Sequence, residues 1–182
     1  MRGFLSVLFF TPLLALAQVD NKNGLASLHE QINEFVSIDG LADHDISDFV
    51  SKIDQKHAEK NSTKFCRTLF NKTSREFFRH YTQETSFGKM LSKGKYNCLT
   101  GTALYALLLD HFAIPYTIIE TNYHIFLLAS TNDGKILFEA TDPLNGFVDN
   151  PNDIEKRIQQ YRRNSIQRVT SDTRKYYAYN FN

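Results

Sequence analysis

The chain has 182 residues, of which 42% are hydrophobic and 13% aromatic, enough to bury the core of one domain with at most a small appendage. Its 21 basic and 20 acidic residues give a formal charge of +1, which argues against the basic field of a nucleic-acid-binding protein. Two cysteines, Cys66 and Cys98, are too few for a disulfide-dense scaffold.

The first 17 residues have the pattern of a signal peptide. Arg2 supplies a positive charge, and residues 4–16 form an apolar run that is too short to be a mature membrane span. Ala15-Leu16-Ala17 has the small-x-small pattern read by signal peptidase, which predicts cleavage near Ala17/Gln18. We therefore expect an exported protein, periplasmic or extracellular, with no membrane span in the mature chain. A buried N-terminal helix is the alternative.

Residues 18–93 are predicted to be a helical N-terminal part of the domain, because apolar residues recur there at three- and four-residue steps. Asp45 is the expected N-cap of one helix, and Asn61-Ser62 precedes another. Thr73-Ser-Arg-Glu76 reads as a capping box that opens a further short helix. The residues expected to face the core are Leu25, Leu28, Ile32, Phe35, Val36, Ile46, Phe49, Val50, Ile53, Phe65, Leu69, Phe70, Phe77, Phe78 and Tyr81.

Residues 94–147 form the predicted core of the domain. The segment from Leu99 to Phe112 is apolar nearly all round, which is typical of a buried central helix, and Pro115 should end it. The period then changes to that of strands, over residues 116–120, 123–129 and 135–141. The turn at residues 130–134 predicts a hairpin between the last two.

Residues 148–182 are predicted to be a C-terminal helix and a tail. Asn152 should cap a helix that carries Ile154, Ile158 and Tyr161. The aromatic tail, residues 176–181, is either a closing strand or a segment that the pattern does not place. Helices followed by a small antiparallel sheet indicate an α+β fold.

Cys98 is the first candidate for chemistry. Asn97 is a competent N-cap, which puts Cys98 in the first turn of the buried helix. The unpaired N–H groups and the positive end of the helix dipole favour an anion there, so the thiolate should be stabilised. Taken alone the position is ambiguous, because many buried cysteines are inert packing residues.

The hairpin provides His124 and Asp142. Both lie nine residues from Asp133, so a loop of odd length centred on Asp133 would place the two side chains directly opposite each other on one sheet face. A carboxylate at that distance would hold the imidazole's tautomer and stabilise its charged form. The alternatives are a core histidine with satisfied hydrogen bonds and an aspartate that ends a strand.

Four segments carry a resemblance to a known family. The cysteine opens a helix, a turn follows, and a histidine and an aspartate come next on adjacent strands. The segments are Tyr96-Asn-Cys98-Leu-Thr-Gly-Thr-Ala-Leu-Tyr-Ala-Leu-Leu-Leu, Phe112-Ala-Ile-Pro115, Tyr123-His124 and Phe138-Glu-Ala-Thr-Asp142-Pro. They resemble the papain-like core of the transglutaminase-like superfamily, and the chain is similar to exported transglutaminase-like proteins of Bacteroidetes. The family often has tryptophan before the cysteine and after the histidine, whereas Asn97 and Ile125 stand here.

The resemblance implies a catalytic triad of Cys98, His124 and Asp142 that performs acyl transfer through a thioester, with no metal or other cofactor. The product is either a hydrolysed amide or peptide bond, or a bond to an amine. The backbone N–H of Cys98 is the expected oxyanion donor, and Asn97 or Tyr96 is a candidate second donor. The expected partner is a protein or peptide substrate in the cell envelope, with no nucleic acid.

Three other interpretations stay open. One is a catalytically inactive binding or scaffold module on the same fold, which the missing aromatics favour. Another is a structural disulfide between Cys66 and Cys98. The third is a metal site built from His111, His124 and Asp142, although no short ligand-pair motif is present. The sequence leaves the oligomeric state undecided.

Overall fold

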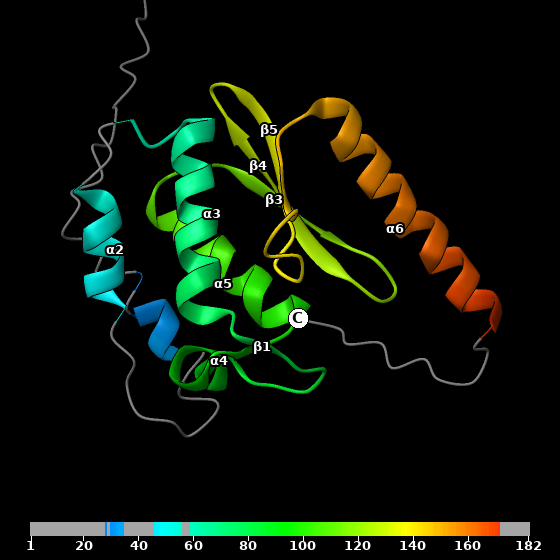
Figure 1. Ribbon diagram of the computed structural model, residues 1–182, viewed down its shortest axis with the longest axis horizontal. Helices are drawn as coiled ribbons and strands as arrows, with labels where there is room; N and C mark the ends of the chain where they lie inside the picture. Colours follow the sequence, from blue (N-terminus) through cyan, green and yellow to red (C-terminus); the bar gives the residue numbers. More distant parts are fainter. Residues whose placement is uncertain (1–27, 29, 35–45, 56–58, 172–182) are drawn as a thin grey trace, which may run out of the picture.

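The computed structural model describes residues 28, 30–34, 46–55 and 59–171. The predicted signal peptide and the aromatic tail lie outside these residues. The fold is α+β, as predicted, with helices packed on a small antiparallel sheet (Figure 1). Within the described ranges no helix is both long enough and apolar enough to cross a membrane.

The helices and strands follow one another along the chain in a mixed order. The helices are α2 (Ser47–Asp54), α3 (Thr63–Phe77), α4 (Phe87–Lys93), α5 (Cys98–His111) and α6 (Pro151–Ser171), and residues 28 and 30–34 are also helical. The strands are β1 (His80–Tyr81), β2 (Lys95–Tyr96), β3 (Tyr116–Glu120), β4 (Ile125–Thr131), β5 (Gly134–Phe138) and β6 (Phe147–Val148). β1 and β2 pair in parallel, and β3-β4-β5-β6 form the antiparallel sheet.

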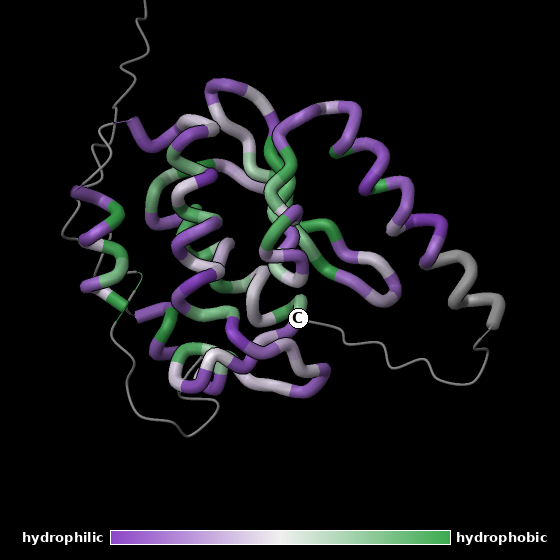
Figure 2. The backbone as a smooth tube through the Cα atoms, viewed as in Figure 1, coloured by the Kyte–Doolittle hydropathy of each residue, from purple (hydrophilic) through white to green (hydrophobic). Residues whose placement is uncertain are grey.

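The larger sheet is covered on both faces. α3 and α5 lie on one side of it and α6 lies on the other (Figure 1). Leu127 and Phe138 project into the main core with α5, while Phe126 and Leu137 pack with Ile158 of α6. Figure 2 shows the apolar strands at the centre, whereas α6 is largely hydrophilic and contributes only a narrow apolar stripe. The sheet is therefore the boundary between two hydrophobic clusters, and α6 is a separate cover.

The central helix forms where the sequence predicted it. α5 ends at His111, and Phe112 is its C-cap. Just beyond, the Ile114 amide bonds the Leu109 carbonyl at 2.9 Å and the Ala113 amide bonds the Asp110 carbonyl at 3.0 Å. This pair of bonds is the Schellman arrangement, which satisfies carbonyls at the helix end. It requires Ala113 in the left-handed region, with a φ of 54°, where an alanine costs about 1 kcal/mol.

Two predicted caps are wrong. Ser62 caps α3 through the Phe65 amide at 3.3 Å, as expected, but the helix then runs without a break through Thr73–Glu76. Thr73, the residue of that pattern expected to cap, is buried within the helix, and the next residue, Ser74, has its hydroxyl 2.8 Å from that of Tyr105. In α6 the cap is not Asn152. The Asn150 side chain accepts from the amides of Asn152 and Asp153.

The hairpin between β4 and β5 has a different register from the predicted one. Thr131 pairs with Gly134 and Leu127 with Phe138, so the loop is the two residues 132–133. The predicted loop had an odd number of residues centred on Asp133. Compared with the predicted loop, a two-residue loop moves the pairing of the two strands by one residue. Side chains that were predicted to share a sheet face then lie on opposite faces.

Candidate active site

Cys98 is the first residue of α5, and its position is fixed by a reciprocal cap. The Asn97 side chain accepts from the Thr100 amide at 2.9 Å, and the Thr100 hydroxyl accepts from the Asn97 amide at 3.1 Å. This confirms the predicted N-cap. The Cys98 side chain is half-buried in the first helical turn, where the helix dipole favours a negative charge.

His124 lies just before β4 and its backbone is held by Thr121. The Thr121 amide and hydroxyl donate to the His124 carbonyl at 2.8 and 3.0 Å, and the His124 amide donates to the Thr121 hydroxyl at 3.1 Å. The imidazole Nε2 bonds the Oε2 atom of Glu139. The histidine side chain is only 11% exposed, so this pair is largely shielded from water.

The same imidazole also interacts with the Cys98 side chain, which is one of the groups that raise the pKa of His124. Burial lowers the pKa of His124, but the hydrogen bonds to Cys98 and Glu139 and their charges outweigh it and raise the pKa to about 9. The histidine is therefore protonated at neutral pH, placed between a thiol and a carboxylate.

Glu139 directly follows β5 and is fully buried. Its Oε1 atom accepts from the Thr141 amide at 3.0 Å and from the Thr141 hydroxyl at 2.6 Å. Its Oε2 atom accepts from the Tyr161 hydroxyl at 2.9 Å, in addition to His124. Burial raises the pKa of this carboxyl, but His124 and Thr141 overcome the effect and hold it below its usual value. Glu139 is therefore a buried carboxylate with donors on both oxygens.

Asp142 is not the carboxylate that meets His124, so the predicted opposition of these two residues is wrong. Its Oδ2 atom accepts from Arg157 of α6 at 3.3 Å, and its Oδ1 atom accepts from the Asn145 amide at 2.9 Å. The cause is the one-residue register difference together with the end of β5 at Phe138. Asp142 instead ties the turn after Glu139 to α6.

The two candidate oxyanion residues have other partners. Tyr96 is buried in β2 and stacks on Phe78, with ring centroids 4.8 Å apart. The Asn97 amide group is used at both ends, since its oxygen caps α5 and its nitrogen donates to the Gln83 carbonyl at 3.1 Å. Both residues therefore help to hold the start of α5, and with it Cys98, in place.

Sequence reasoning missed Glu139, Tyr161 and Tyr81. A glutamate at the end of an apolar strand was the available signal for Glu139, because a buried carboxylate requires a partner. Tyr81 was expected to face the core, but it is 55% exposed. Burial raises the pKa of Tyr81, and so do the charges of Cys98 and Glu139, which places its phenol near the site. The sequence carried no signal for the contacts of Tyr81 and Tyr161, which depend on tertiary packing.

The two cysteines are free. Cys66 is buried in α3, where desolvation and the charge of Asp133 raise the pKa of its thiol to about 12. The alternative of a Cys66–Cys98 disulfide is therefore not what the structure contains. In the part of the chain that the structure describes, no three histidine, cysteine, aspartate or glutamate side chains gather closely enough to hold a metal ion.

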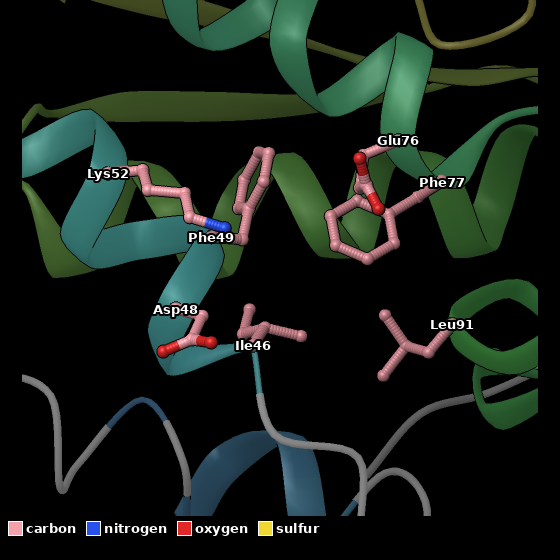
Figure 3. A pocket seen from close by; sticks show the side chains of 7 residues that line it. All are labelled: Ile46, Asp48, Phe49, Lys52, Glu76, Phe77 and Leu91. Carbon is pink, nitrogen blue, oxygen red and sulfur yellow. The ribbon is translucent and has the colours of Figure 1, made fainter.

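A cavity of about 330 Å³ lies elsewhere, between α2, α3 and α4 (Figure 3). Phe49, Phe77 and Leu91 form apolar walls, and charged side chains from α2 and α3 project at its rim. Cys98, His124 and Glu139 do not line it. The lining is Ile46, Asp48, Phe49, Lys52, Glu76, Phe77 and Leu91.

Comparison with known proteins found no relative of the chain. No protein-family model, no curated protein and no solved structure matches the chain.

Proposed function

We propose that this chain is an exported cysteine enzyme of transglutaminase-like type, which performs acyl transfer with Cys98, His124 and Glu139. The observation that carries the proposal is the position of His124, whose imidazole bonds the Glu139 carboxylate and interacts with the Cys98 side chain. A nucleophile that contacts a base, which is oriented in turn by a third group, is the general arrangement of covalent catalysis. The export part of the proposal is supported by the signal-like pattern of residues 1–17.

The chemistry follows from the charges. In the resting pair the proton of the Cys98 thiol already lies on His124, which leaves a thiolate beside an imidazolium. The thiolate attacks the carbonyl carbon of an amide, a C–S bond forms, and the charge develops on the carbonyl oxygen. The backbone N–H of Cys98, at the start of α5, is the donor best placed to stabilise that oxyanion. As the tetrahedral intermediate collapses, the C–N bond breaks and the imidazolium gives its proton to the leaving amine.

The second half of the cycle consumes the thioester. Neutral His124 removes a proton from water or from an amine, which attacks the thioester carbonyl, and the thiolate of Cys98 leaves. The first acceptor gives hydrolysis and the second gives a new amide bond. Glu139 orients the ring and stabilises the imidazolium in both halves. Its fixed geometry supports this role, because hydrogen bonds from Thr141 hold the carboxylate independently of His124.

Alkylation of Cys98 tests the proposed thiolate–imidazolium pair. An ordinary thiol with a pKa of about 8.5 is only about 0.3% thiolate at pH 6. We expect iodoacetamide to label Cys98 rapidly at pH 6, and we expect His124→Ala and Glu139→Gln to slow this labelling roughly 10- to 100-fold. Peptide mapping separates Cys98 from Cys66, which is buried and should stay unlabelled in the folded chain.

Asp142→Asn is the matched control for Glu139→Gln, since both changes remove one negative charge from neighbouring carboxylates. We expect it to change the labelling rate less than about threefold, because Asp142 bonds Arg157 and not His124. Slow labelling of the wild type, with the pH dependence of a free thiol and no effect of His124→Ala, would refute the proposed pair.

Turnover needs a separate assay, because fold alone does not ensure activity. Envelope peptides would be incubated with and without an amine donor, and amine release or incorporation would be compared between wild type and Cys98→Ala. Turnover that disappears in Cys98→Ala supports the enzyme. A reactive Cys98 with no turnover on any amide would favour the alternative, an inactive transglutaminase-like binding or scaffold module in the cell envelope.

A further inference from the structure

Tyr161 of α6 contacts both the histidine and the carboxylate of the candidate site. Its hydroxyl donates to the Oε2 atom of Glu139 at 2.9 Å, the same oxygen that bonds Nε2 of His124. Its ring lies beside the imidazole, with centroids 4.8 Å apart, and beside Phe126 at 5.0 Å. One side chain therefore restrains the carboxylate by a hydrogen bond and the imidazole by packing.

The phenol is held as a donor. Burial and the negative charge of Glu139 raise the pKa of Tyr161 above its ordinary value, so the hydroxyl keeps its proton across the working pH range. Arg157, one helical turn earlier, interacts with Tyr161 and also bonds Asp142 Oδ2 at 3.3 Å. The apolar stripe of α6 docks on the sheet through Ile154 and Ile158. α6 is thus fixed to the sheet by apolar packing and to Glu139 and the following turn by hydrogen bonds.

We propose that Tyr161 is a positioning residue of the site, so that the C-terminal helix α6 completes a catalytic centre whose other parts come from α5 and the sheet. The inference rests on the proposed function, because it assigns Tyr161 a role in the thiolate–imidazolium pair. A donor on Oε2 stabilises the ionised form of Glu139. An ionised Glu139 in turn keeps the proton on His124, and with it the thiolate on Cys98.

The titratable and charged groups around the Glu139 carboxylate determine what a pH profile of Cys98 reactivity measures. His124 and Tyr161 contact it directly, Cys98 lies beyond His124, and Arg157 lies beyond Tyr161. Three more distant phenols sense its charge: Tyr81, Tyr96 and Tyr105. Burial is the main cause that raises the pKa of each of these phenols, so all three remain neutral in the acidic range. The acid limb of Cys98 reactivity therefore reports the titration of the Glu139 carboxylate and of the Cys98–His124 ion pair.

The test is the rate of Cys98 alkylation between pH 4 and 8 in the full chain, with Tyr161→Phe as the variant. Phenylalanine keeps the ring and removes the hydroxyl. Loss of the donor raises the pKa of the carboxyl, so we expect the acid limb of the profile to move up by about half to one pH unit. The rate at a pH below the midpoint of that limb should then fall about 3- to 10-fold, while the rate at pH 6 changes little. A purely structural hydroxyl would change the unfolding midpoint without moving the acid limb.

Tyr123→Phe is the matched control. Its hydroxyl also lies beside the site but donates to the Tyr161 backbone carbonyl, at 3.2 Å. We expect it to leave the acid limb in place. An unmoved limb in Tyr161→Phe, or an equal shift in both variants, overturns the positioning role, while the proposed function stands if His124→Ala still slows labelling. If wild-type Cys98 reacts as an ordinary thiol, the proposed function fails and the inference fails with it.

Discussion

Gly101 sets how closely α5 approaches the end of β5. It lies one turn after Cys98, and a Cβ atom built on it would lie 2.6 Å from the Ala140 Cβ and 3.3 Å from Cζ of Phe78. Ala140 is the residue next to Glu139. The absence of a side chain at Gly101 therefore lets the start of the helix that carries the thiol contact the strand end that carries the carboxylate.

The size of the perturbation in Gly101→Ala follows from these distances. Carbon atoms pack best at about 3.5–4.0 Å, so the helix and the strand end must separate by roughly 1 Å. Such overpacking costs about 1–3 kcal/mol, and alanine returns about 1 kcal/mol through its better helix propensity. We expect the free energy of unfolding to fall by about 0–2 kcal/mol. A displacement of 1 Å between reacting groups is much more serious for chemistry, at about 100-fold in rate.

Two measurements separate the effects of Gly101→Ala. Urea unfolding gives the loss in stability, and iodoacetamide labelling at pH 6 reports the contact between Cys98 and His124. We expect labelling to slow at least 10-fold in a chain that is still folded. The double variant Gly101→Ala/Ala140→Gly restores the space and should recover the rate to within about threefold. An undiminished rate in the single variant, or no recovery in the double one, would refute the role assigned to this close approach.

Two further predictions concern stability. Because the pKa of His124 is raised from 6.5 to about 9 and that of Glu139 is lowered from 4.5, the pair should stabilise the fold fully between about pH 5 and 6.5. Stability should fall as the pH rises through 9 and as it drops below 4.5, and Glu139→Gln should flatten both limbs in urea unfolding. Tyr105→Phe should cost about 1–3 kcal/mol, because the buried Tyr105 hydroxyl bonds Ser74 and donates to the Phe70 carbonyl. Adding Ser74→Ala should recover part of that loss, and labelling of Cys98 should be unchanged in both variants.

The parts of the fold that local patterns determine were predictable. α5 and its Asn97 cap are encoded within a few residues, and β3 begins and ends at the predicted positions. The two-residue strands β1, β2 and β6 were not predicted, since each exists only through its pairing with a distant segment. The capping-box pattern at residues 73–76 failed for the same reason. Thr73 is buried in the core and Ser74 bonds Tyr105, so the helix continues through the pattern.

The candidate site depended on one number that spacing alone left open, the length of the hairpin loop. Residues two apart along a strand share a face, so the pairing of Leu127 with Phe138 puts Phe126 opposite Glu139 and His124 on the same face two residues away. A longer loop centred on Asp133 would have put Asp142 there instead. The apolar residues decide between the two registers. The observed one buries Phe138 against α5 and Leu137 against α6, so both faces of β5 are covered. The carboxylate beside His124 is therefore determined by how the sheet divides its apolar side chains between α5 and α6. The sequence alone did not show that α6 covers the second face of the sheet, so it did not determine this register.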